Sequence, residues 1–335
     1  MESRQYDEML MQRAVVLASG VRATTSPNPW VGCVIATPDG ATFEGATQPP
    51  GGDHAEIVAL AAAGAKAAGA TLYSTLEPCA HHGRTPPCTD AMIAAGVARV
   101  VVAVGDPDAL VEGKGIEQLR QAGIKVDIGI CADEVDRQLQ SYLKHRTTGR
   151  PWVVLKLAAT LDGRTAASDG TSQWITGEAA RKDAHRLRAE SDAVLVGAGT
   201  VRADDPSLTV RLPTVGAGRQ PQRVVLGTAP PEAKVHPAWE LSGDLGKVLD
   251  DLGERGIVQL LVEGGATVAH GFHAAGLVDR YVLYLAPALM GGDDGRPLFA
   301  GAGAPTIDDM WRGRIVDVTT LGPDIRVDLA GAGTA

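Results

Sequence analysis

A histidine and two cysteines are the feature that most constrains the fold of this chain. His54 precedes Glu56 by two residues, Cys79 follows a proline, and Cys88 comes after eight intervening residues. One imidazole and two thiolates make a tetrahedral Zn²⁺ site whose fourth position is left for water. A fold that forms this site brings the segment around His54 against the segment that carries the cysteines.

The carboxylate of Glu56 is the general acid/base that a water on such a zinc ion needs. The order H-x-E…P-C-x(n)-C is that of the zinc-dependent deaminases, here with a wider gap between the cysteines than the usual two residues. The H-x-E triplet is weak by itself, and its combination with Pro-Cys and a second cysteine is specific. In the alternative interpretation the zinc is structural, His81 or His82 supplies a fourth ligand, and the chain is a ligand-binding or regulatory protein.

Composition predicts a globular enzyme of two domains that acts on a small molecule. The chain has 335 residues, which is enough for two cores, and 44% of them are hydrophobic and 21% charged. Its formal net charge is −9 and no Lys/Arg cluster stands out. A protein that binds a phosphate backbone is expected to present a basic face, so nucleic acid is disfavoured as a partner.

The N-terminus and the cysteines predict a cytoplasmic protein. Residues 1–8 lack the basic and apolar regions of a signal peptide, and no run of about 18 apolar residues predicts a membrane helix. Two of the four cysteines are assigned to zinc, which fits a reducing compartment. Cys33 and Cys131 are expected to be structural.

The first domain, residues 1–146, is expected to be an α/β sandwich. Its strands are predicted at 31–36, 70–75, 99–104 and 125–128, and its helices at 6–18, 54–63, 89–95 and 115–122. This alternation predicts a sheet covered by helices. Both ligand segments fall where a strand ends and a helix begins, and the positive end of a helix favours Cys79 as a thiolate.

A second α/β domain is predicted over residues 151–331. A polar helix ending at Arg146 is followed by a Gly-Arg-Pro sequence that indicates a domain seam. Strands are predicted at 152–158, 193–196, 223–226, 259–262 and 280–285, with a helix at 178–189 and an antiparallel pair at 315–320 and 325–329. The stretch 227–256 is expected to be either a mobile loop or a trimmed part of the sheet.

Longer motifs carry a resemblance to a known family. In the first half they are Asn28-Pro29-Trp30-Val31-Gly32, His54-Ala55-Glu56 and the run from Thr75 to Cys88, with Gly-Arg-Thr-Pro-Pro between the cysteines. In the second half they lie at 156–164, 172–176, 196–201, 203–211 and 262–265. From about residue 9 to residue 329 the chain resembles the bifunctional riboflavin-biosynthesis deaminase–reductases. The resemblance implies a cytidine-deaminase-like α/β/α sandwich followed by a dihydrofolate-reductase-like domain.

For the first half, the resemblance implies deamination of a diamino-ribosylamino-pyrimidinone 5′-phosphate. Zn²⁺ on His54, Cys79 and Cys88 would make hydroxide available near neutral pH. Glu56 would take the proton from that water and pass it to the departing amine.

Two further residues of the first half are candidates for substrate binding. Asn28 is a candidate partner of the pyrimidine ring, although Ser-Pro-Asn-Pro is also a strong turn sequence. Arg84 is a candidate for the substrate phosphate or ribose. Asp108 stands where the family usually has Asn, which argues against a substrate contact there.

For the second half, the resemblance implies that NADPH reduces the ribosyl group to a ribityl chain. The residues that match substrate positions are Lys156, Ser172, Arg188, Leu208, Arg211 and Glu263. Those that match cofactor positions are Ala158, Trp174, Thr200, Asp204 and Gly265. The two arginines suit a phosphate through their planar donors. In the alternative readings, Arg188 is exposed on its helix and Trp174 packs in the core.

The second half is not predicted to be a doubly wound dinucleotide-binding domain. Gly197-Ala198-Gly199 follows a strand, but Arg202 stands where the third glycine of the fingerprint belongs. These glycines are expected to let the backbone approach a phosphate or ribose. Gly227 replaces a frequent Asp of the family, so an alternative is a deaminase-only enzyme with a non-catalytic, ligand-binding second domain. The resemblance also favours NADPH over NADH and a homo-oligomer.

Overall fold

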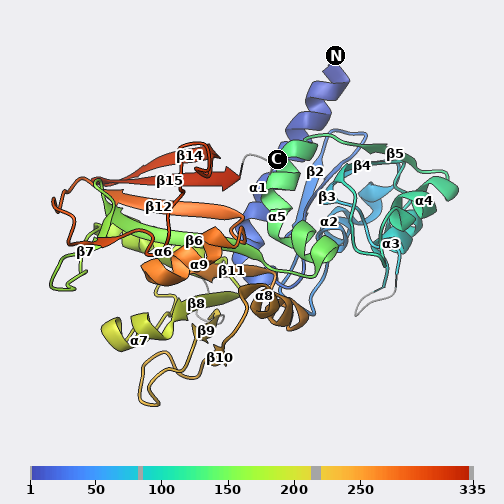
Figure 1. Ribbon diagram of the computed structural model, residues 1–335. Helices are drawn as coiled ribbons and strands as arrows, with labels where there is room; N and C mark the ends of the chain where they lie inside the picture. Colours follow the sequence, from blue (N-terminus) through green and yellow to red (C-terminus); the bar gives the residue numbers. More distant parts are fainter. Residues whose placement is uncertain (1, 82–85, 213–219, 332–335) are drawn as a thin grey trace. The chain divides into compact units, whose positions relative to one another are not determined.

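The computed structural model describes residues 2–81, 86–212 and 220–331. The chain divides into two compact units, Met1–Gly149 and Arg150–Ala335. Each unit contains its own mixed or largely parallel sheet with helices packed on it, as Figure 1 shows for both. Both halves are therefore α/β, which is the predicted fold class.

Five strands form the sheet of the first unit, in the order β2-β1-β3-β4-β5. They are β1 (Gly32–Ala36), β2 (Thr42–Ala46), β3 (Thr71–Leu76), β4 (Arg99–Val104) and β5 (Lys125–Ile128). β1 runs antiparallel to β2 and to β3, whereas β3, β4 and β5 are parallel. The sequence Thr-Phe-Glu-Gly-Ala of β2 is partly exposed and lacks an apolar run, so its pattern does not predict a strand.

Helices cover both faces of this sheet. They are α1 (Glu2–Thr25), α2 (Ala55–Ala63), the 3₁₀ helix η1 (Gly64–Ala67), α3 (Cys88–Ala94), α4 (Lys114–Gln121) and α5 (Ala132–Thr148). Two glycines allow the close packing: a Cβ on Gly32 would lie 1.9 Å from the Ala14 carbonyl oxygen of α1, and one on Gly45 would lie 2.2 Å from the Ala55 carbonyl oxygen of α2. Gly45 of β2 pairs with Cys33, the residue after Gly32 in β1. Because successive residues of a strand face opposite sides of the sheet, Gly32 and Gly45 face opposite sides, and so α1 and α2 lie on opposite faces.

The second unit has an eight-stranded sheet in the order β10-β9-β8-β11-β6-β12-β15-β14. In chain order these strands are β6 (Trp152–Thr160), β8 (Ala193–Gly197), β9 (Gln222–Leu226), β10 (Trp239–Leu241), β11 (Gln259–Val262), β12 (Arg280–Ala286), β14 (Gly313–Leu321) and β15 (Asp324–Gly331). The strands from β10 to β12 are parallel, and β15 and β14 continue the sheet antiparallel. A short antiparallel pair, β7 (Arg164–Ala166) and β13 (Arg296–Pro297), is separate.

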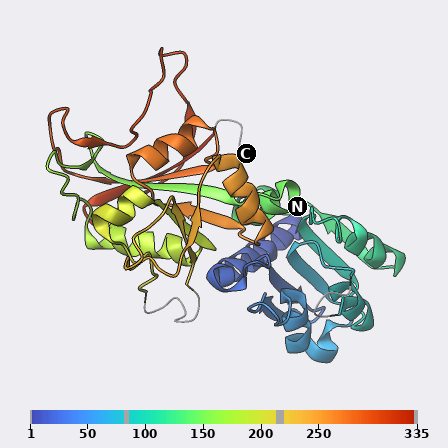
Figure 2. The same cartoon turned by 60° about the horizontal axis from the view of Figure 1, so that its bottom comes forward.

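Helices also cover both faces of the larger sheet (Figure 2). They are α6 (Glu178–Ala189), α7 (Ala198–Asp204), α8 (Leu245–Glu254) and α9 (Ala266–Ala274). One apolar cluster joins alternate residues of the central strands to α8 and α9, and a second joins the intervening residues to α6 and α7. The alternation of side chains along each strand therefore builds two cores from the same strands.

The stretch 227–256 has regular structure, so the expectation of a mobile loop is wrong. It contains β10 and α8, and the Asp244 side chain caps α8 by accepting a hydrogen bond from the Lys247 N–H at 3.0 Å. Val248, Leu249 and Leu252 are buried on the sheet. In the described part of the chain, no helix has the length and hydropathy of a membrane span.

Candidate active sites

Three candidate metal ligands meet in the first unit. His54 precedes α2, Cys79 follows β3, and Cys88 is the first residue of α3. Their ligand atoms all lie within 4.8 Å of one another. The His54 Nδ1 atom is 3.3 Å from Cys88 Sγ and 3.6 Å from Cys79 Sγ. The fold therefore brings together side chains that are up to 34 positions apart in sequence.

This donor set fits a zinc ion with one position left open. One imidazole nitrogen and two sulfurs are the ligand types that zinc prefers, and a catalytic site keeps three protein ligands. His81 lines the adjoining pocket but is not one of the three clustered residues, and His82 lies outside the described residues. Within the described residues, the cluster is thus the open kind rather than the closed, four-ligand kind.

The environment of Cys79 favours its thiolate form. A hydrogen bond with the Cys88 side chain, another with His54 and a third from the Cys88 N–H lower the pKa of the Cys79 thiol to about 4, despite its partial burial. The Cys88 N–H lies 3.4 Å from Cys79 Sγ. The helix N-terminus that was expected near Cys79 is that of α3, which begins at Cys88. Its first N–H group donates to the Cys79 sulfur.

Glu56 lies in the first turn of α2, directly beside the cluster. Its side chain is buried, and it accepts a hydrogen bond from the Ser74 hydroxyl at 3.2 Å. Its other oxygen is 3.5 Å from Cys88 Sγ. Burial raises the pKa of the Glu56 carboxyl above its ordinary value. A buried carboxyl in this position is suited to carry a proton.

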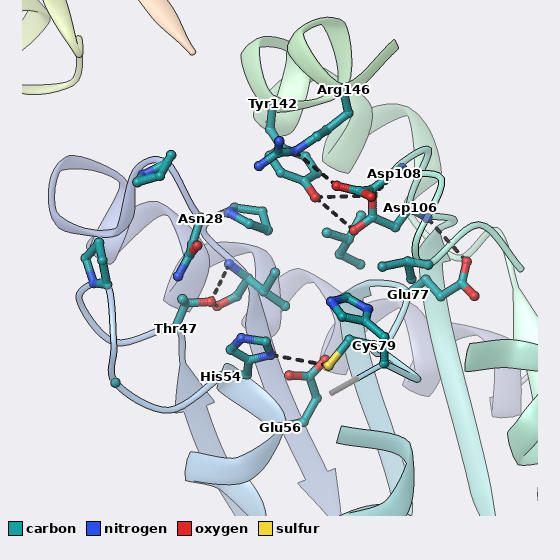
Figure 3. Close-up of a pocket in the computed structure, with 18 of the residues that line it drawn as sticks. Asn28, Thr47, His54, Glu56, Glu77, Cys79, Asp106, Asp108, Tyr142 and Arg146 are labelled. Atoms are coloured by element: carbon teal, nitrogen blue, oxygen red, sulfur yellow. Dashed lines mark hydrogen bonds and ion pairs between the residues drawn. The ribbon is translucent and has the colours of Figure 1, made fainter. Parts of the chain in front are cut away.

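A pocket of about 420 Å³ opens above the cluster. Figure 3 shows His54, Glu56 and Cys79 at its base and Asn28 on its wall. The Asn28 N–H also donates to the Thr25 carbonyl oxygen at 3.0 Å, so the turn and the pocket contact predicted for Asn28 coexist. Arg84 lies outside the described residues.

The opposite wall of the pocket contains Asp106 and Asp108 together with Tyr142 and Arg146, and no motif indicated the last two. The Tyr142 hydroxyl donates to both carboxylate oxygens of Asp106, at 3.2 and 3.0 Å. Arg146, one helical turn further along α5, faces Asp108 with its Nε atom 3.5 Å from a carboxylate oxygen. Burial raises the pKa of the Asp106 carboxyl. The spacing of Tyr142 and Arg146 by four residues is the sequence signal that places both on one face of the helix.

Glu77 ties this wall to the cysteine segment. Its buried carboxylate accepts backbone N–H groups of Asp106, Gly113, Gly115 and Ile116 at 3.1 to 3.3 Å. A Cβ on Gly115 would lie 1.9 Å from the Pro78 carbonyl oxygen, so glycine is needed for this approach. Glu77, which directly precedes Pro78-Cys79, therefore holds the start of α4 and the loop before it against the cysteine segment.

The second unit has a cavity of about 650 Å³. Eight of the residues assigned by resemblance line it, namely Lys156, Trp174, Arg188, Thr200, Asp204, Leu208, Arg211 and Glu263. Three others are not among its lining residues. Ser172 precedes the lining residue Gln173, Ala158 packs partly buried on the core of β6, and the Gly265 N–H donates to the Thr200 hydroxyl at 3.2 Å.

A group of three partly buried charged side chains lines this cavity. Arg188 donates to both oxygens of Glu263, at 2.5 and 3.0 Å, and Lys156 Nζ lies 3.8 Å from Glu263. Burial lowers the pKa of the Lys156 ammonium, although Glu263 opposes this shift. Burial alone would raise the pKa of Glu263, but Arg188 and Lys156 outweigh it and hold that pKa below its ordinary value. Arg188 is therefore not an exposed helix residue, and Glu263 already uses its planar donors.

Trp174 is exposed rather than packed in the core, with the Arg181 guanidinium 4.7 Å from its ring centre. His185, which the sequence analysis did not single out, also lines the cavity, and its Nδ1 atom accepts the Arg211 N–H at 3.3 Å. Gly197 is a packing position, because a Cβ there would lie 2.8 Å from the Val268 side chain. Packing against Val268 therefore explains the glycine at position 197 without the expected close approach of a ligand.

Comparison with known proteins gives a family match for each half of the chain. Residues 4–104 match the cytidine and deoxycytidylate deaminase zinc-binding region, and residues 151–327 match the RibD C-terminal domain. The chain is 41% identical to the riboflavin biosynthesis protein RibD of Escherichia coli K12, over 97% of this chain and 100% of that protein. It is 45% identical to the Mycobacterium tuberculosis H37Rv protein of the same name, over 92% and 93% of the two chains.

Solved structures give the same result. Acinetobacter baumannii RibD, form 1, superposes with a TM-score of 0.93 at 42% identity, covering 98% of this chain and 99% of that chain. A Thermotoga maritima diaminohydroxyphosphoribosylaminopyrimidine deaminase/5-amino-6-(5-phosphoribosylamino)uracil reductase superposes with a TM-score of 0.89 at 34% identity, covering 98% and 100%.

The fold and the sites define a two-domain enzyme with a zinc-binding deaminase unit and a reductase unit. The chain belongs to the RibD family of bifunctional riboflavin-biosynthesis deaminase–reductases. The predicted family, fold class and pair of activities are confirmed, as are zinc and NADPH as the cofactors.

Proposed function

We propose that the first unit deaminates a diamino-ribosylamino-pyrimidinone 5′-phosphate and that the second reduces the ribosyl group of the deaminated product. The observation that carries the proposal is the open His54, Cys79 and Cys88 cluster beside buried Glu56, at the base of a pocket. The Thermotoga maritima relative is named for a deaminase and a reductase acting on substrates of this class. The deaminase-only alternative is less favoured, because the second unit has a cavity lined by a group of three partly buried charged side chains.

In the deaminase site, His54, Cys79 and Cys88 would hold the zinc ion. When bound, zinc supplies the Lewis acidity that lets water act as a nucleophile near neutral pH. Glu56 accepts the proton that the attacking water loses and delivers it to the amine nitrogen as the carbon–nitrogen bond breaks, which releases ammonia. Ser74 holds one Glu56 oxygen in place for both transfers. Asn28 on the pocket wall orients the pyrimidine ring, and Arg84 stays a proposed phosphate or ribose contact.

In the reductase site, NADPH supplies the hydride. We assign Lys156, Ser172, Arg188, Leu208, Arg211 and Glu263 to the substrate, and Ala158, Trp174, Thr200, Asp204 and Gly265 to the cofactor. Lys156 is a partly buried ammonium that supplies a proton to the opened sugar, and Glu263 holds it there. Exposed Arg211 has donors for the substrate phosphate, whereas Arg188 orients Glu263.

We also propose that the chain acts in the cytoplasm as a homo-oligomer. Zinc thiolates and two further free cysteines suit a reducing compartment. The edge strand β14 exposes the apolar residues Ile315, Val316 and Val318, which supports contact with a second copy.

Two variants test the division of labour. Glu56→Gln keeps the metal cluster but removes the proton carrier, so ammonia release should fall by about 10²- to 10⁴-fold while zinc stays bound. Lys156→Met should abolish NADPH oxidation with the deaminated substrate and leave ammonia release intact. Ammonia, NADPH and zinc content are measured on the same preparations. Unchanged ammonia release in Glu56→Gln would overturn the assigned deaminase mechanism.

A further inference from the structure

Arg146 is a cation in a pocket that also has four carboxylic acids among its described lining residues. Among the described residues that line the deaminase pocket, Arg146 is the single arginine or lysine. The carboxylic acids of the same lining are Glu56, Glu77, Asp106 and Asp108. A substrate with a 5′-phosphate brings about two further negative charges into this space near pH 7. Unless a cation compensates, the phosphate is repelled by the same wall that surrounds the pyrimidine.

The structure holds the Arg146 guanidinium in a fixed place. Its Nε atom faces Asp108 at 3.5 Å, and its central carbon lies 5.1 Å from the Tyr142 ring centre. Figure 3 shows Arg146 beside Tyr142 on the upper wall, away from His54 and Cys79 at the base. The cation is therefore separated from the reacting end of the pocket, on the side where the far end of a substrate would lie.

Asp108 orients Arg146 without using all its donors. A guanidinium has five N–H donors in a planar fork, and Nε is the atom that faces Asp108. Asp108 itself is anchored, because its backbone N–H donates to Asp106 at 2.9 Å and its side chain accepts the Leu110 N–H at 3.0 Å. The Asp that stands where the family usually has Asn thus has a defined role: it pairs with Arg146.

We propose that Arg146 binds the 5′-phosphate of the deaminase substrate and that Asp108 positions Arg146 for this contact. The inference rests on the proposed function, because it takes the substrate to be a phosphate ester. Arg146 then determines specificity: it favours the phosphorylated substrate over the corresponding nucleoside. Charge-assisted, bidentate contacts of arginine with phosphate are strong enough for this selection.

Deamination of the phosphorylated compound and of its dephosphorylated nucleoside, compared in full-length zinc-loaded variants, tests the proposal. Arg146→Met removes the charge and keeps apolar bulk. Its kcat/KM for the phosphorylated compound should fall by roughly 10- to 100-fold, mainly through KM, as expected for lost charge-assisted hydrogen bonds. The nucleoside should lose much less. Arg146→Lys should recover part of the phosphate preference, because it restores the charge without the planar fork.

Arg137→Met is the matched control. Arg137 is an exposed residue of the same helix α5 and does not line the pocket, so the same loss of charge there should leave the phosphate preference unchanged. The zinc content of each variant reports that its first unit has folded, because the three ligands meet only in the folded unit.

Two outcomes separate the inference from the function on which it rests. Equal losses on both compounds in Arg146→Met would overturn the role of Arg146 as a phosphate ligand. Failure of the unmodified enzyme to deaminate the phosphorylated compound would instead overturn the proposed function. Asp108→Asn tests the positioning role of Asp108. If Asp108 positions Arg146, this variant also loses preference for the phosphorylated compound. An unchanged preference would contradict that role.

Discussion

At the scale of single residues, the reductase cavity depends on how three charges share a buried space. Lys156 loses hydration there, and the positive Arg188 also disfavours its charged form, while Glu263 favours it. Replacing one member of such a group leaves the others without compensation, because buried charges are stable only when paired. The protonation of Lys156 is therefore controlled by Glu263.

The pH profile of the reduction should reveal this control in Glu263→Gln. Removing the carboxylate leaves burial and Arg188 unopposed, so the pKa of Lys156 falls further below its ordinary value. Lys156 then loses its proton at lower pH, and the alkaline limb of kcat/KM for reduction should move toward acid. The pH profile of ammonia release in the same variant is the control. An unmoved alkaline limb would show that Lys156 is not the proton donor.

Residues that act through short motifs could be predicted from the sequence, and those that act from separate elements could not. His54 and Glu56 are two positions apart, and the cysteines lie in one continuous run. Tyr142 and Arg146 belong to α5, far from that run, and reach the pocket because α5 packs beside β4. Their spacing by four residues places both on one face of the helix, but it does not indicate that this face lines the pocket.

At the scale of elements, Glu77 connects the end of β3 to the start of α4. One carboxylate accepts four backbone N–H groups from a loop and a helix N-terminus. Helix N-termini have N–H groups without partners within the helix, and a carboxylate there also complements the helix dipole. This contact fixes the loop that carries Asp106 and Asp108.

Loss of the Glu77 carboxylate should loosen that loop. Glu77→Ala leaves several buried N–H groups without an acceptor, so the first unit should lose about 3 kcal/mol of unfolding free energy. Amide hydrogen exchange at Gly113, Gly115 and Ile116 should accelerate, and KM for deamination should rise. Glu117→Ala, on the exposed side of α4, is the control. Unaltered exchange at the three amides would contradict the positioning role of Glu77.

Buried, apolar elements could be predicted from the sequence better than half-exposed ones. β4 and β11 are buried and have the predicted bounds, because a run such as Arg-Val-Val-Val-Ala-Val has a single interpretation. β2 and β10 were not predicted, because both are short edge strands whose sequences mix polar and apolar residues. Helix α8 was missed because its sequence contains two glycines and several charged residues, although its buried face carries Val248, Leu249 and Leu252.

At the scale of the whole molecule, two separate sheets serve two chemistries. Each unit has its own sheet. The candidate zinc ligands lie in the first unit, and the charged group of Lys156, Arg188 and Glu263 lies in the second. The units divide between Gly149 and Arg150, inside the predicted Gly-Arg-Pro seam. The sequence could predict this organisation because the motifs of the two families do not overlap along the chain.

The central claim is that one chain performs both steps in order. Its most direct test is an assay of the purified protein with the diamino-ribosylamino-pyrimidinone 5′-phosphate, following ammonia and NADPH together. The account predicts ammonia release without NADPH and, when NADPH is added, oxidation of one NADPH for each ammonia released. Ammonia release with no NADPH oxidation would contradict the claim and identify a deaminase with a non-catalytic second domain.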